Sequence, residues 1–406
     1  MILKGKNIVL GVTGGIACYK AADLCSKLVQ AGAIVDVIMT QAALAFMTPL
    51  TFQTLTKRPV SVDMFQLLRD TDMAHISLAQ RADVLVIAPA TANTLAKLAH
   101  GLADNLLTST ALACTAPLVL APAMDTDMWE NPITRANIQA LRERGAVIVG
   151  PGYGRLASGR IGAGRLVATE EILGAIRQTL GRKGPLAGAR LVVTAGGTQE
   201  PLDPVRHLTN RSSGKMGYAL AEAARDAGAQ VTLITAPTAL SAPYGVERVP
   251  VRTAAEMEEA VLGRLAETDI LLMAAAVADY RPKVTAAQKI KKGEGSLTLE
   301  LEKTADILAE VAQRRPSAGR PLVMVGFAAE TEHLLENATA KMQAKRLDLM
   351  VANDVSSPDS GFEVDTNRVI LLTSDGGQEA LPLMSKADVA EHIIARVAEM
   401  WRRIHG

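Results

Sequence analysis

The sequence has almost no excess charge of either sign and no long apolar run. Its 406 residues include 43 lysines and arginines against 42 aspartates and glutamates, a formal net charge of +1. This balance argues against a nucleic-acid partner or a membrane-surface role, because both require concentrated basic residues. No segment reaches the roughly 18 apolar residues that cross a bilayer. The short apolar run at 7–12 ends in a glycine turn, as a first strand does and a signal peptide does not, so we expect a cytoplasmic protein.

Cysteine is scarce as well. The three cysteines, Cys18, Cys25 and Cys114, are odd in number and form no C-x-x-C pair. This excludes an even disulfide framework and favours a reducing compartment. Cys18 and Cys25 lie seven residues apart on an expected helix, a spacing that predicts packing in the core.

Strand-length apolar runs dominate the first half of the chain and alternate with helical segments. The runs at 7–12, 34–40, 82–90, 116–123 and 146–150 are almost continuously apolar. Such runs are typical of a parallel sheet that is covered on both faces by helices. The first half is therefore predicted to be an α/β domain with a doubly wound parallel sheet.

The same pattern restarts after residues 181–189, which are rich in glycine, charge and proline. A strand and glycine turn at 190–198 precede a helix at 217–229 and a strand at 230–237. We therefore predict two doubly wound, Rossmann-like domains, residues 1–180 and residues 190–406.

Each half has a glycine turn where its first strand ends. The segments are "GVTGGIA" (11–17) and "VTAGGT" (193–198), and neither is a G-x-G-x-x-G motif. Glycines allow close backbone approach, and the next helix offers free N–H groups to a phosphate. A plain strand-to-helix turn explains each one alone, but the repetition favours two phosphate-bearing ligands. A third segment, "NRSSGKMG" (210–217), is either a phosphate or carboxylate cradle or a helix cap.

Two aspartates follow a buried strand in "PAMDTDMW" (122–129). The pattern is compatible with a general-base pair, a metal site, a helix N-cap or a modified substrate pocket. Because no histidine or cysteine lies nearby in sequence, a metal site is disfavoured. Asp127 is the residue expected to cap a short helix here.

Longer motifs resemble known families. In the first half, "GVTGGIACYK", "APATANTLAK" (88–97), "GLADNLL" (101–107) and "PAMDTDMW" resemble the FMN-binding flavoprotein family of cysteine decarboxylases. In the second half, "TAGGTQEPLDPVRHLTNRSSGKMG" (194–217), "AAAVADYRP" (274–282) and "KIKK" (289–292) resemble phosphopantothenate–cysteine ligase. The two sets of motifs, in this order along the chain, resemble the bifunctional family of coenzyme A biosynthesis. The resemblance covers nearly the whole chain.

The resemblance implies a flavodoxin-like N-terminal domain, a nucleotide-binding C-terminal domain and two reactions. The ligase activates 4'-phosphopantothenate with CTP and Mg2+ to an acyl-cytidylate, and cysteine then displaces CMP. The flavin domain oxidises the cysteinyl thiol with FMN, which lets CO2 leave, and the enethiol is reduced to 4'-phosphopantetheine. The resemblance also implies a homo-oligomer built from trimers of the flavin domain.

Carried over from the ligase family, Asn210 contacts the reacting carboxyl group, Arg206 and Lys215 neutralise substrate anions, and Lys289 faces the triphosphate. Lys341 and Lys345, four residues apart, would otherwise be an ordinary exposed helix face. Ala305 stands where the family usually has proline, which we expect to loosen the nucleotide loop. The implied nucleotide-binding residues are Ala275, Ala276, Asp279, Lys289, Ala305, Asp306, Ile307, Phe327, Lys341 and Lys345.

Carried over from the flavoprotein family, His75 lies beside the flavin near the substrate and is expected to be catalytic. A lone histidine is otherwise more often a structural residue. The implied metal ligands are unknown. The residues implied to contact FMN are Gly14, Gly15, Ile16, Ala17, Thr40, Ala90 and Thr91.

Two positions depart from the flavoprotein pattern. Asp125 replaces an asparagine that binds the substrate carboxylate, and an ionised aspartate repels such an anion unless burial raises its pKa and keeps it neutral. Ser158, in the flap-like segment 153–166, replaces a cysteine that donates a proton, and a hydroxyl is far less acidic than a thiol. We therefore predict an intact ligase and an impaired decarboxylase. The alternatives are an N-terminal assembly scaffold or a flavoenzyme for another thiol.

Overall fold

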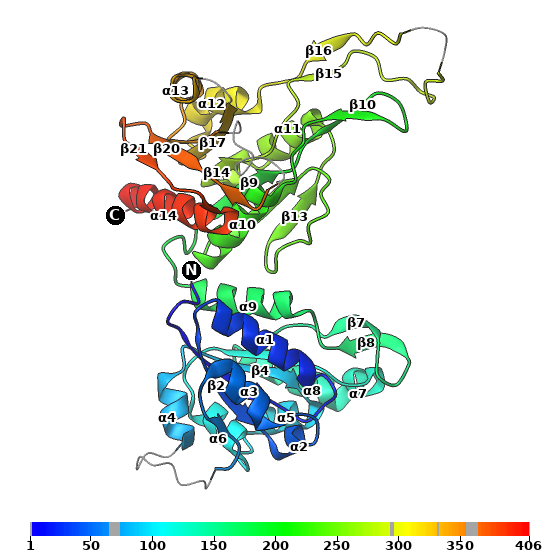
Figure 1. Cartoon of the computed structure of the whole chain (residues 1–406), viewed down its shortest axis with the longest axis vertical. Helices are drawn as coiled ribbons and strands as arrows, with labels where there is room; N and C mark the ends of the chain where they lie inside the picture. The colour runs from blue at the N-terminus through cyan, green and yellow to red at the C-terminus, as the bar shows by residue number, and fades with distance from the viewer. Residues whose placement is uncertain (1, 65–73, 293–295, 331–332, 355–363, 406) are drawn as a thin grey trace. The chain divides into compact units, whose positions relative to one another are not determined.

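The computed structural model divides into two compact units, Met1–Gly181 and Arg182–Gly406 (Figure 1). It describes residues 2–64, 74–292, 296–330, 333–354 and 364–405. Each unit has its own sheet and its own hydrophobic core.

The first unit contains a six-stranded parallel sheet, which confirms the doubly wound architecture. Its strand order is β3-β2-β1-β4-β5-β6. This is the 3-2-1-4-5-6 order of dinucleotide-binding folds rather than the 2-1-3-4-5 order of flavodoxin, so the flavodoxin-like detail is corrected. The strands are β1 (Asn7–Val12), β2 (Ile34–Met39), β3 (Val60–Ser61), β4 (Val84–Ala90), β5 (Leu118–Pro122) and β6 (Val147–Ile148).

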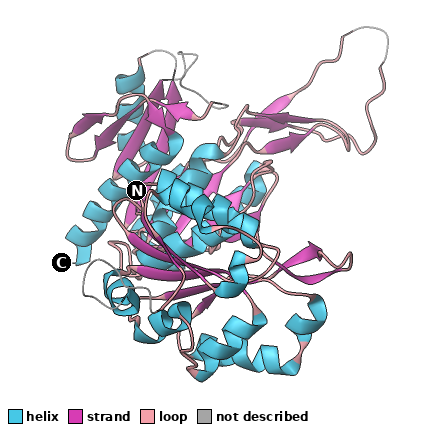
Figure 2. Cartoon of the chain, turned by 60° about the horizontal axis from the view of Figure 1, so that its bottom comes forward, coloured by secondary structure: helices cyan, strands magenta, loops and turns pink. Residues whose placement is uncertain are grey.

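Helices cover both faces of this sheet because each presents one apolar stripe. In the first helix, α1, the buried positions include Cys18, Ala21, Cys25 and Leu28, which recur at helical spacing. Both predicted core cysteines are fully buried. Figure 2 shows helices packed alongside the strands. Helix α1 contacts α3 and α9, and α4, α5, α6 and α8 form a second group that packs on the cluster around Val9 and Leu85. The helices are α1 (Cys18–Gln30), α2 (Gln41–Leu44), α3 (Pro49–Thr56), α4 (Ala74–Arg81), α5 (Ala92–His100), α6 (Leu106–Ala113), α7 (Thr126–Glu130), α8 (Pro132–Glu143) and α9 (Thr169–Gly181).

A short antiparallel hairpin projects between β6 and α9. It consists of β7 (Gly152–Arg155) and β8 (Ile161–Arg165) and corresponds to the flap-like segment of the sequence.

The second unit contains an eight-stranded sheet with the order β13-β12-β9-β14-β17-β18-β20-β21. Its first six strands are parallel and repeat the order of the first unit, β20 pairs antiparallel with β18, and β21 pairs antiparallel with β20. The strands are β9 (Arg190–Ala195), β12 (Gln230–Thr235), β13 (Glu247–Pro250), β14 (Ile270–Met273), β17 (Val323–Glu330), β18 (Leu349–Asp354), β20 (Val369–Thr373) and β21 (Gln378–Ala380).

Two apolar clusters hold the second unit together, one on each face of the sheet. Helices α10 and α14 pack against one face, and α11, α12 and α13 contribute to the cluster on the other. Each fully buried leucine or valine stabilises the fold by about 1.5–3 kcal/mol relative to exposure. The helices are α10 (Lys215–Asp226), α11 (Ala254–Leu262), the 3-10 helix η1 (Leu265–Glu267), α12 (Ile307–Ala318), α13 (Leu334–Ala344) and α14 (Lys386–His405).

Three two-stranded ribbons complete the second unit. Two of them extend away from the large sheet (Figure 1), and the third lies before α14. They pair β10 (Gln199–Pro201) with β11 (His207–Thr209), β15 (Tyr280–Pro282) with β16 (Leu301–Lys303), and β19 (Thr366–Asn367) with β22 (Met384–Ser385). In the parts of the chain that the structure describes, no helix has the length and apolar character that a bilayer crossing requires.

Candidate active sites

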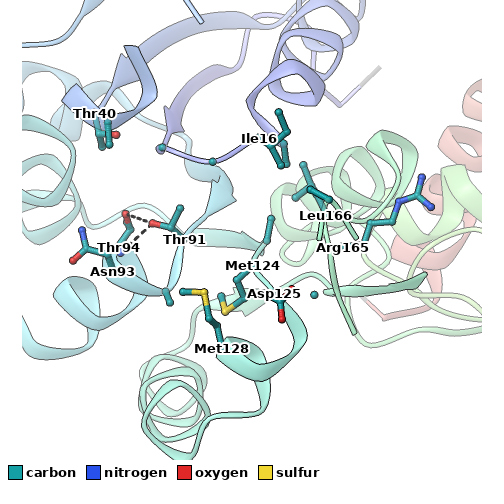
Figure 3. Close-up of a pocket in the computed structure, with 18 of the residues that line it drawn as sticks. Ile16, Thr40, Thr91, Asn93, Thr94, Met124, Asp125, Met128, Arg165 and Leu166 are labelled. Atoms are coloured by element: carbon teal, nitrogen blue, oxygen red, sulfur yellow. Dashed lines mark hydrogen bonds between the residues drawn. The ribbon is translucent and has the colours of Figure 1, made fainter. Parts of the chain in front are cut away.

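The first unit has a cavity of about 1170 Å³ at the carboxyl ends of β1 and β4. The strand order reverses between these two strands, which is where doubly wound folds bind ligands. In the view of Figure 3, Thr40, Thr91 and Thr94 lie on one side of the cavity, and Ile16 and Leu166 lie on the other. The cavity therefore has a polar wall and an apolar wall.

The turn after β1 requires glycine. A Cβ built on Gly14 would lie 2.4 Å from the Cβ of Ala42 and 2.8 Å from its backbone, whereas a Cβ on Gly15 meets nothing closer than 3.8 Å. Gly14 thus permits close packing of the turn, and Gly15 leaves open space at the cavity wall. Nearby, the Thr91 hydroxyl caps α5 by accepting from the Thr94 N–H at 3.4 Å.

Thr40 carries the clearest sign of a ligand. It lines the cavity, and its buried hydroxyl oxygen has no hydrogen-bond partner among the described residues. A buried hydroxyl without a partner costs free energy, so a ligand atom in the cavity is its natural partner. With the Gly14 turn and the N-terminus of α5, this wall fits a polar, phosphate-bearing ligand.

Most of the predicted flavin residues meet at this cavity. Ala90 is buried within β4 and is not a lining residue. His75 lies on α4 and is not a lining residue either, and its Nδ1 is buried without a partner in the described part of the chain. The predicted residues that do line the cavity are Gly14, Gly15, Ile16, Ala17, Thr40, Thr91, Asp125 and Ser158.

The β7–β8 hairpin closes against the segment that contains Asp125. Met124 N–H donates to Gly164 O at 2.9 Å, and the Thr126 hydroxyl donates to Ala163 O at 2.8 Å. A Cβ on Gly162 would lie 2.3 Å from Thr126 Oγ1, and a Cβ on Gly164 would lie 2.3 Å from Met124 O. Glycine at these two positions therefore lets the hairpin approach closely enough to place Ser158 at the cavity.

Asp125, rather than Asp127, is the N-cap of α7. Its carboxylate accepts from the Asp127 N–H at 3.3 Å, which corrects the prediction that Asp127 would cap this helix. The Ser158 hydroxyl donates to Asp125 Oδ2 at 2.7 Å, and Arg160 Nη1 lies 3.4 Å from Asp125 Oδ1. Arg160 also binds Asp127 through two contacts, at 2.5 and 3.0 Å.

These contacts determine the charge of Asp125. The Ser158 hydrogen bond, followed by the Asp127 N–H and the positive charge of Arg160, lowers the pKa of Asp125. These contacts favour the ionised form of Asp125 over a neutral form with a raised pKa. The metal interpretation gains no support, because the described residues hold no group of three histidine, cysteine or acidic side chains able to bind an ion.

The second unit has a cavity of about 570 Å³ at the corresponding place, beyond the carboxyl end of β14 and beside the N-terminus of α10. Residues 273–280, which continue from β14, line it together with Asn210 and Lys215. Asn210 Nδ2 donates to Ala276 O at 3.3 Å and to Val277 O at 3.2 Å. These bonds fix the asparagine at the cavity wall, next to the N-terminus of α10.

This second cavity is rich in lysine. Lys345 Nζ lies 2.9 Å from Asp306, which caps α12, and Lys215 Nζ lies 2.6 Å from Asp365. The lining lysines are Lys215, Lys303, Lys341, Lys345 and Lys386, and the lining acids are Asp279 and Asp306. The composition fits a ligand with several negative charges.

Lys386 was not identified from the sequence. It is 6 % exposed, its Nζ donates to Val364 O at 2.6 Å, and it begins α14. Burial, and next the charge of Lys215, lowers the pKa of Lys386 to about 8. The available sequence signal was a lysine opening a helix, where the helix dipole disfavours a cation.

Two predicted ligase residues do not line this cavity. Arg206 donates to both Asp203 and Ile290 O, and Lys289 is exposed beside Ile290. The Asp203 carboxylate accepts hydrogen bonds from Arg206 and from the Ile290 N–H. The Arg206 hydrogen bond holds the pKa of Asp203 well below its usual range. The predicted residues that do line the cavity are Asn210, Lys215, Ala275, Ala276, Asp279, Ala305, Asp306, Ile307, Phe327, Lys341 and Lys345.

Comparison with known proteins gives a consistent result for each unit. A family described as "Flavoprotein" matches residues 2–181, and one described as "DNA/pantothenate metabolism flavoprotein C-terminal domain" matches residues 186–400. The coenzyme A biosynthesis bifunctional protein CoaBC of Bacillus subtilis (strain 168) is 46% identical over 402 residues, covering 98% of both chains. The protein of the same name from Mycobacterium tuberculosis (strain ATCC 25618 / H37Rv) is 46% identical over 401 residues, covering 96% of this chain and 95% of that one.

Among solved structures, the C-terminal domain of a coenzyme A biosynthesis bifunctional protein CoaBC is 39% identical, with a TM-score of 0.47. The match covers 54% of this chain and 100% of the solved domain. The near full-length identity to the two bifunctional relatives establishes that this chain belongs to the family of coenzyme A biosynthesis bifunctional proteins.

Proposed function

We propose that the chain performs two consecutive reactions of coenzyme A biosynthesis. The second unit joins cysteine to 4'-phosphopantothenate with CTP, and the first unit decarboxylates the product to 4'-phosphopantetheine. The observation that carries this proposal is that each unit has its own cavity at its own strand-order reversal, one with a polar and an apolar wall and one rich in lysine. Full-length similarity to bifunctional relatives supports the same division.

The first cavity fits FMN. The Gly14 turn and the N-terminus of α5 would hold its phosphate, and Thr40 Oγ1 would gain the partner it lacks among the described residues. Bound FMN supplies the two-electron oxidation of the cysteinyl thiol and the return of those electrons. Ile16 and Leu166 offer apolar surface to the ligand, and the β7–β8 hairpin places Ser158 where it can hold or donate a proton.

The second cavity suits CTP. Its lysines neutralise the triphosphate, and Mg2+ would be held mainly by phosphate oxygens, as is usual for this ion. Asn210 is an uncharged residue at the wall, fixed by Ala276 O and Val277 O, and can steady charge that develops on the reacting carboxylate. The carboxylate attacks the nucleotide, pyrophosphate leaves, and the cysteine amine then displaces CMP.

The role predicted for His75 requires a second copy of the chain or a rearrangement. His75 lies on α4 and does not line the cavity of its own unit. The trimer of flavin units predicted from the family resemblance would bring a neighbouring copy near the cavity. We propose this arrangement, and measurement of the oligomeric state of the purified chain checks it.

Separate assays of the two half-reactions test the proposal. The first supplies 4'-phosphopantothenate, cysteine, CTP and Mg2+, and the second supplies 4'-phosphopantothenoylcysteine to the FMN-loaded chain. We expect pyrophosphate release and the amide product in the first assay, and CO2 release in the second. A chain that purifies without flavin and takes up none would favour an assembly scaffold. Flavin reduction only by a thiol without a carboxylate would favour a changed flavoenzyme. The predicted impairment of the decarboxylase remains a prediction.

A further inference from the structure

An ionised Asp125 presents a physical difficulty for the proposed decarboxylation. Asp125 lines the cavity, and its lowered pKa keeps it negative at neutral pH. The substrate carries its own carboxylate into the same cavity. Two like charges in proximity repel, and the repulsion grows as water is excluded.

Arg160 lies where it can offset this repulsion. It comes from the tip of the β7–β8 hairpin, and its guanidinium contacts both Asp125 and Asp127. The Arg160 side chain is half-exposed and does not itself line the cavity, so it acts on a bound substrate through Asp125, whose charge it offsets. Ser158, two residues earlier in the same turn, donates to the other oxygen of Asp125.

The hairpin backbone fixes this arrangement independently of the charges. The bonds of Met124 N–H to Gly164 O and of Thr126 Oγ1 to Ala163 O hold β8 against the N-terminus of α7. Arg160 therefore reaches Asp125 from the turn that leads directly into this anchored strand. A surface ion pair alone would contribute little, typically about 0–1 kcal/mol. This pair differs because Asp125 also forms part of the cavity wall.

We infer that Arg160 is a positioning residue that makes Asp125 compatible with a carboxylate substrate, so that Asp125 and Arg160 together replace a single neutral side chain. This inference rests on the proposed decarboxylation and adds a determinant of specificity to it. It also limits the impairment predicted from the sequence. Asp125 no longer prevents carboxylate binding, and only the weak acidity of Ser158 remains as a handicap.

A double-mutant cycle between Arg160→Met and Asp125→Asn tests the inference. The readout is the Kd of 4'-phosphopantothenoylcysteine, titrated against the flavin absorbance of the full-length FMN-loaded chain. The decarboxylation kcat and KM are measured in parallel. We expect Arg160→Met alone to weaken binding roughly 10- to 100-fold, because it leaves Asp125 without its cation. In the Asp125→Asn background the same change should cost less than about threefold, and Arg160→Lys should recover part of the loss because it restores the charge.

A second ligand separates charge compensation from a purely structural effect. The product 4'-phosphopantetheine lacks the carboxylate, so we expect its Kd to be unchanged by Arg160→Met. Arg135→Met, an exposed arginine on α8 outside the cavity, is the matched control for loss of a surface charge. The ligase activity of the second unit, measured on the same samples, verifies the concentration of folded protein.

Two results would overturn the inference: equal losses from Arg160→Met with aspartate or asparagine at position 125, or equal losses for ligands with and without the carboxylate. The proposed function fails in a different way. In that case the flavin is bound and the ligand titrates, but neither the parent chain nor Asp125→Asn releases CO2. The binding cycle still decides the inference.

Discussion

The two units of this chain have the same parallel strand order but prepare their cavities differently. In the first unit a glycine-rich turn, an unpartnered threonine hydroxyl and a hairpin define the site, and the charges near Asp125 are paired. In the second unit five lysines line the corresponding position. The shared topology determines where a ligand binds, and the side chains at that place determine which ligand and which chemistry. Changes at the shared position should therefore separate the two activities.

Gly14→Val should have the largest effect. The new side chain would overlap Ala42, including its backbone, and would distort the turn that is proposed to hold the flavin phosphate. We expect FMN retention to fall by a factor on the order of 100 or more, while ligase activity in the second unit is unchanged. Flavin absorbance after gel filtration and pyrophosphate release measure the two outcomes. Gly15→Ala, which meets no close atom, should leave the thermal unfolding of the flavin-free chain near that of the parent. Full flavin retention in Gly14→Val would contradict the proposed location of FMN.

Asn210→Asp should have the opposite effect, a loss of ligase activity in the second unit with the flavin unit unaffected. The aspartate loses both donated hydrogen bonds to Ala276 O and Val277 O and places a negative charge beside the reacting carboxylate. We expect ligase kcat/KM to fall roughly 100-fold or more, in the range of lost electrostatic stabilisation at active sites. Decarboxylation of supplied 4'-phosphopantothenoylcysteine should be unaffected. Loss of both activities would show that the units are not independent.

Ser158→Cys should have a smaller effect confined to the first unit. A thiol is much more acidic than a hydroxyl, so it is the better proton donor in the last reduction. We expect the ratio of 4'-phosphopantetheine to enethiol among the products to rise by roughly tenfold. Mass spectrometry of the quenched reaction measures this ratio. An unchanged ratio would remove Ser158 from the proton-transfer step.

Lys386→Met should have the smallest effect, visible as a pH dependence of stability. The pKa of Lys386 is lowered to about 8 in the folded chain from an ordinary value of 10.5. Between these values the unfolded chain binds more protons, so the free energy of unfolding of the parent rises with pH from about 8 to 10.5. Below this window the full cost of burying the charge is present. The variant should lack the rise.

The fluorescence of Trp401 on α14 reports this unfolding. The chain has two tryptophans, so a Trp129→Phe background in both the parent and the variant removes the signal of the first unit. Parallel pH profiles for the two chains would contradict a buried, charged Lys386.

The sequence was informative where the signal is local. Continuous apolar runs predicted the buried parallel strands, because strand burial depends on neighbouring residues. The segments at 11–17 and 210–217 predicted parts of the two cavities, but no residue of the glycine turn at 193–198 lines the second cavity, because Gly196 and Gly197 pack against Ala236 and Asn210 instead. The strand order of the first unit was not predictable in this way. Order is set by contacts between distant segments, and the family resemblance suggested the flavodoxin order instead of the observed one.

The ion pair of Asp125 with Arg160 could not be predicted for the same reason. The sequence shows Asp125 as a departure next to Asp127, but Arg160 lies 35 positions away and meets it only through the hairpin register. Lys386 likewise reaches its cavity from the last helix of the chain. Residues that modify a site from another segment leave no local pattern, whereas the segments 11–17 and 210–217, which line the two cavities, do.

The most direct test of the account is a single reaction that uses both units. The full-length FMN-loaded chain receives 4'-phosphopantothenate, cysteine, CTP and Mg2+, and products are identified by mass spectrometry. We expect release of CO2 and passage of the acyl-cysteine through to enethiol or 4'-phosphopantetheine, with more 4'-phosphopantothenoylcysteine left unconverted by Arg160→Met than by the parent. Accumulation of 4'-phosphopantothenoylcysteine by the parent chain would contradict the account and would mean that Arg160 does not compensate Asp125.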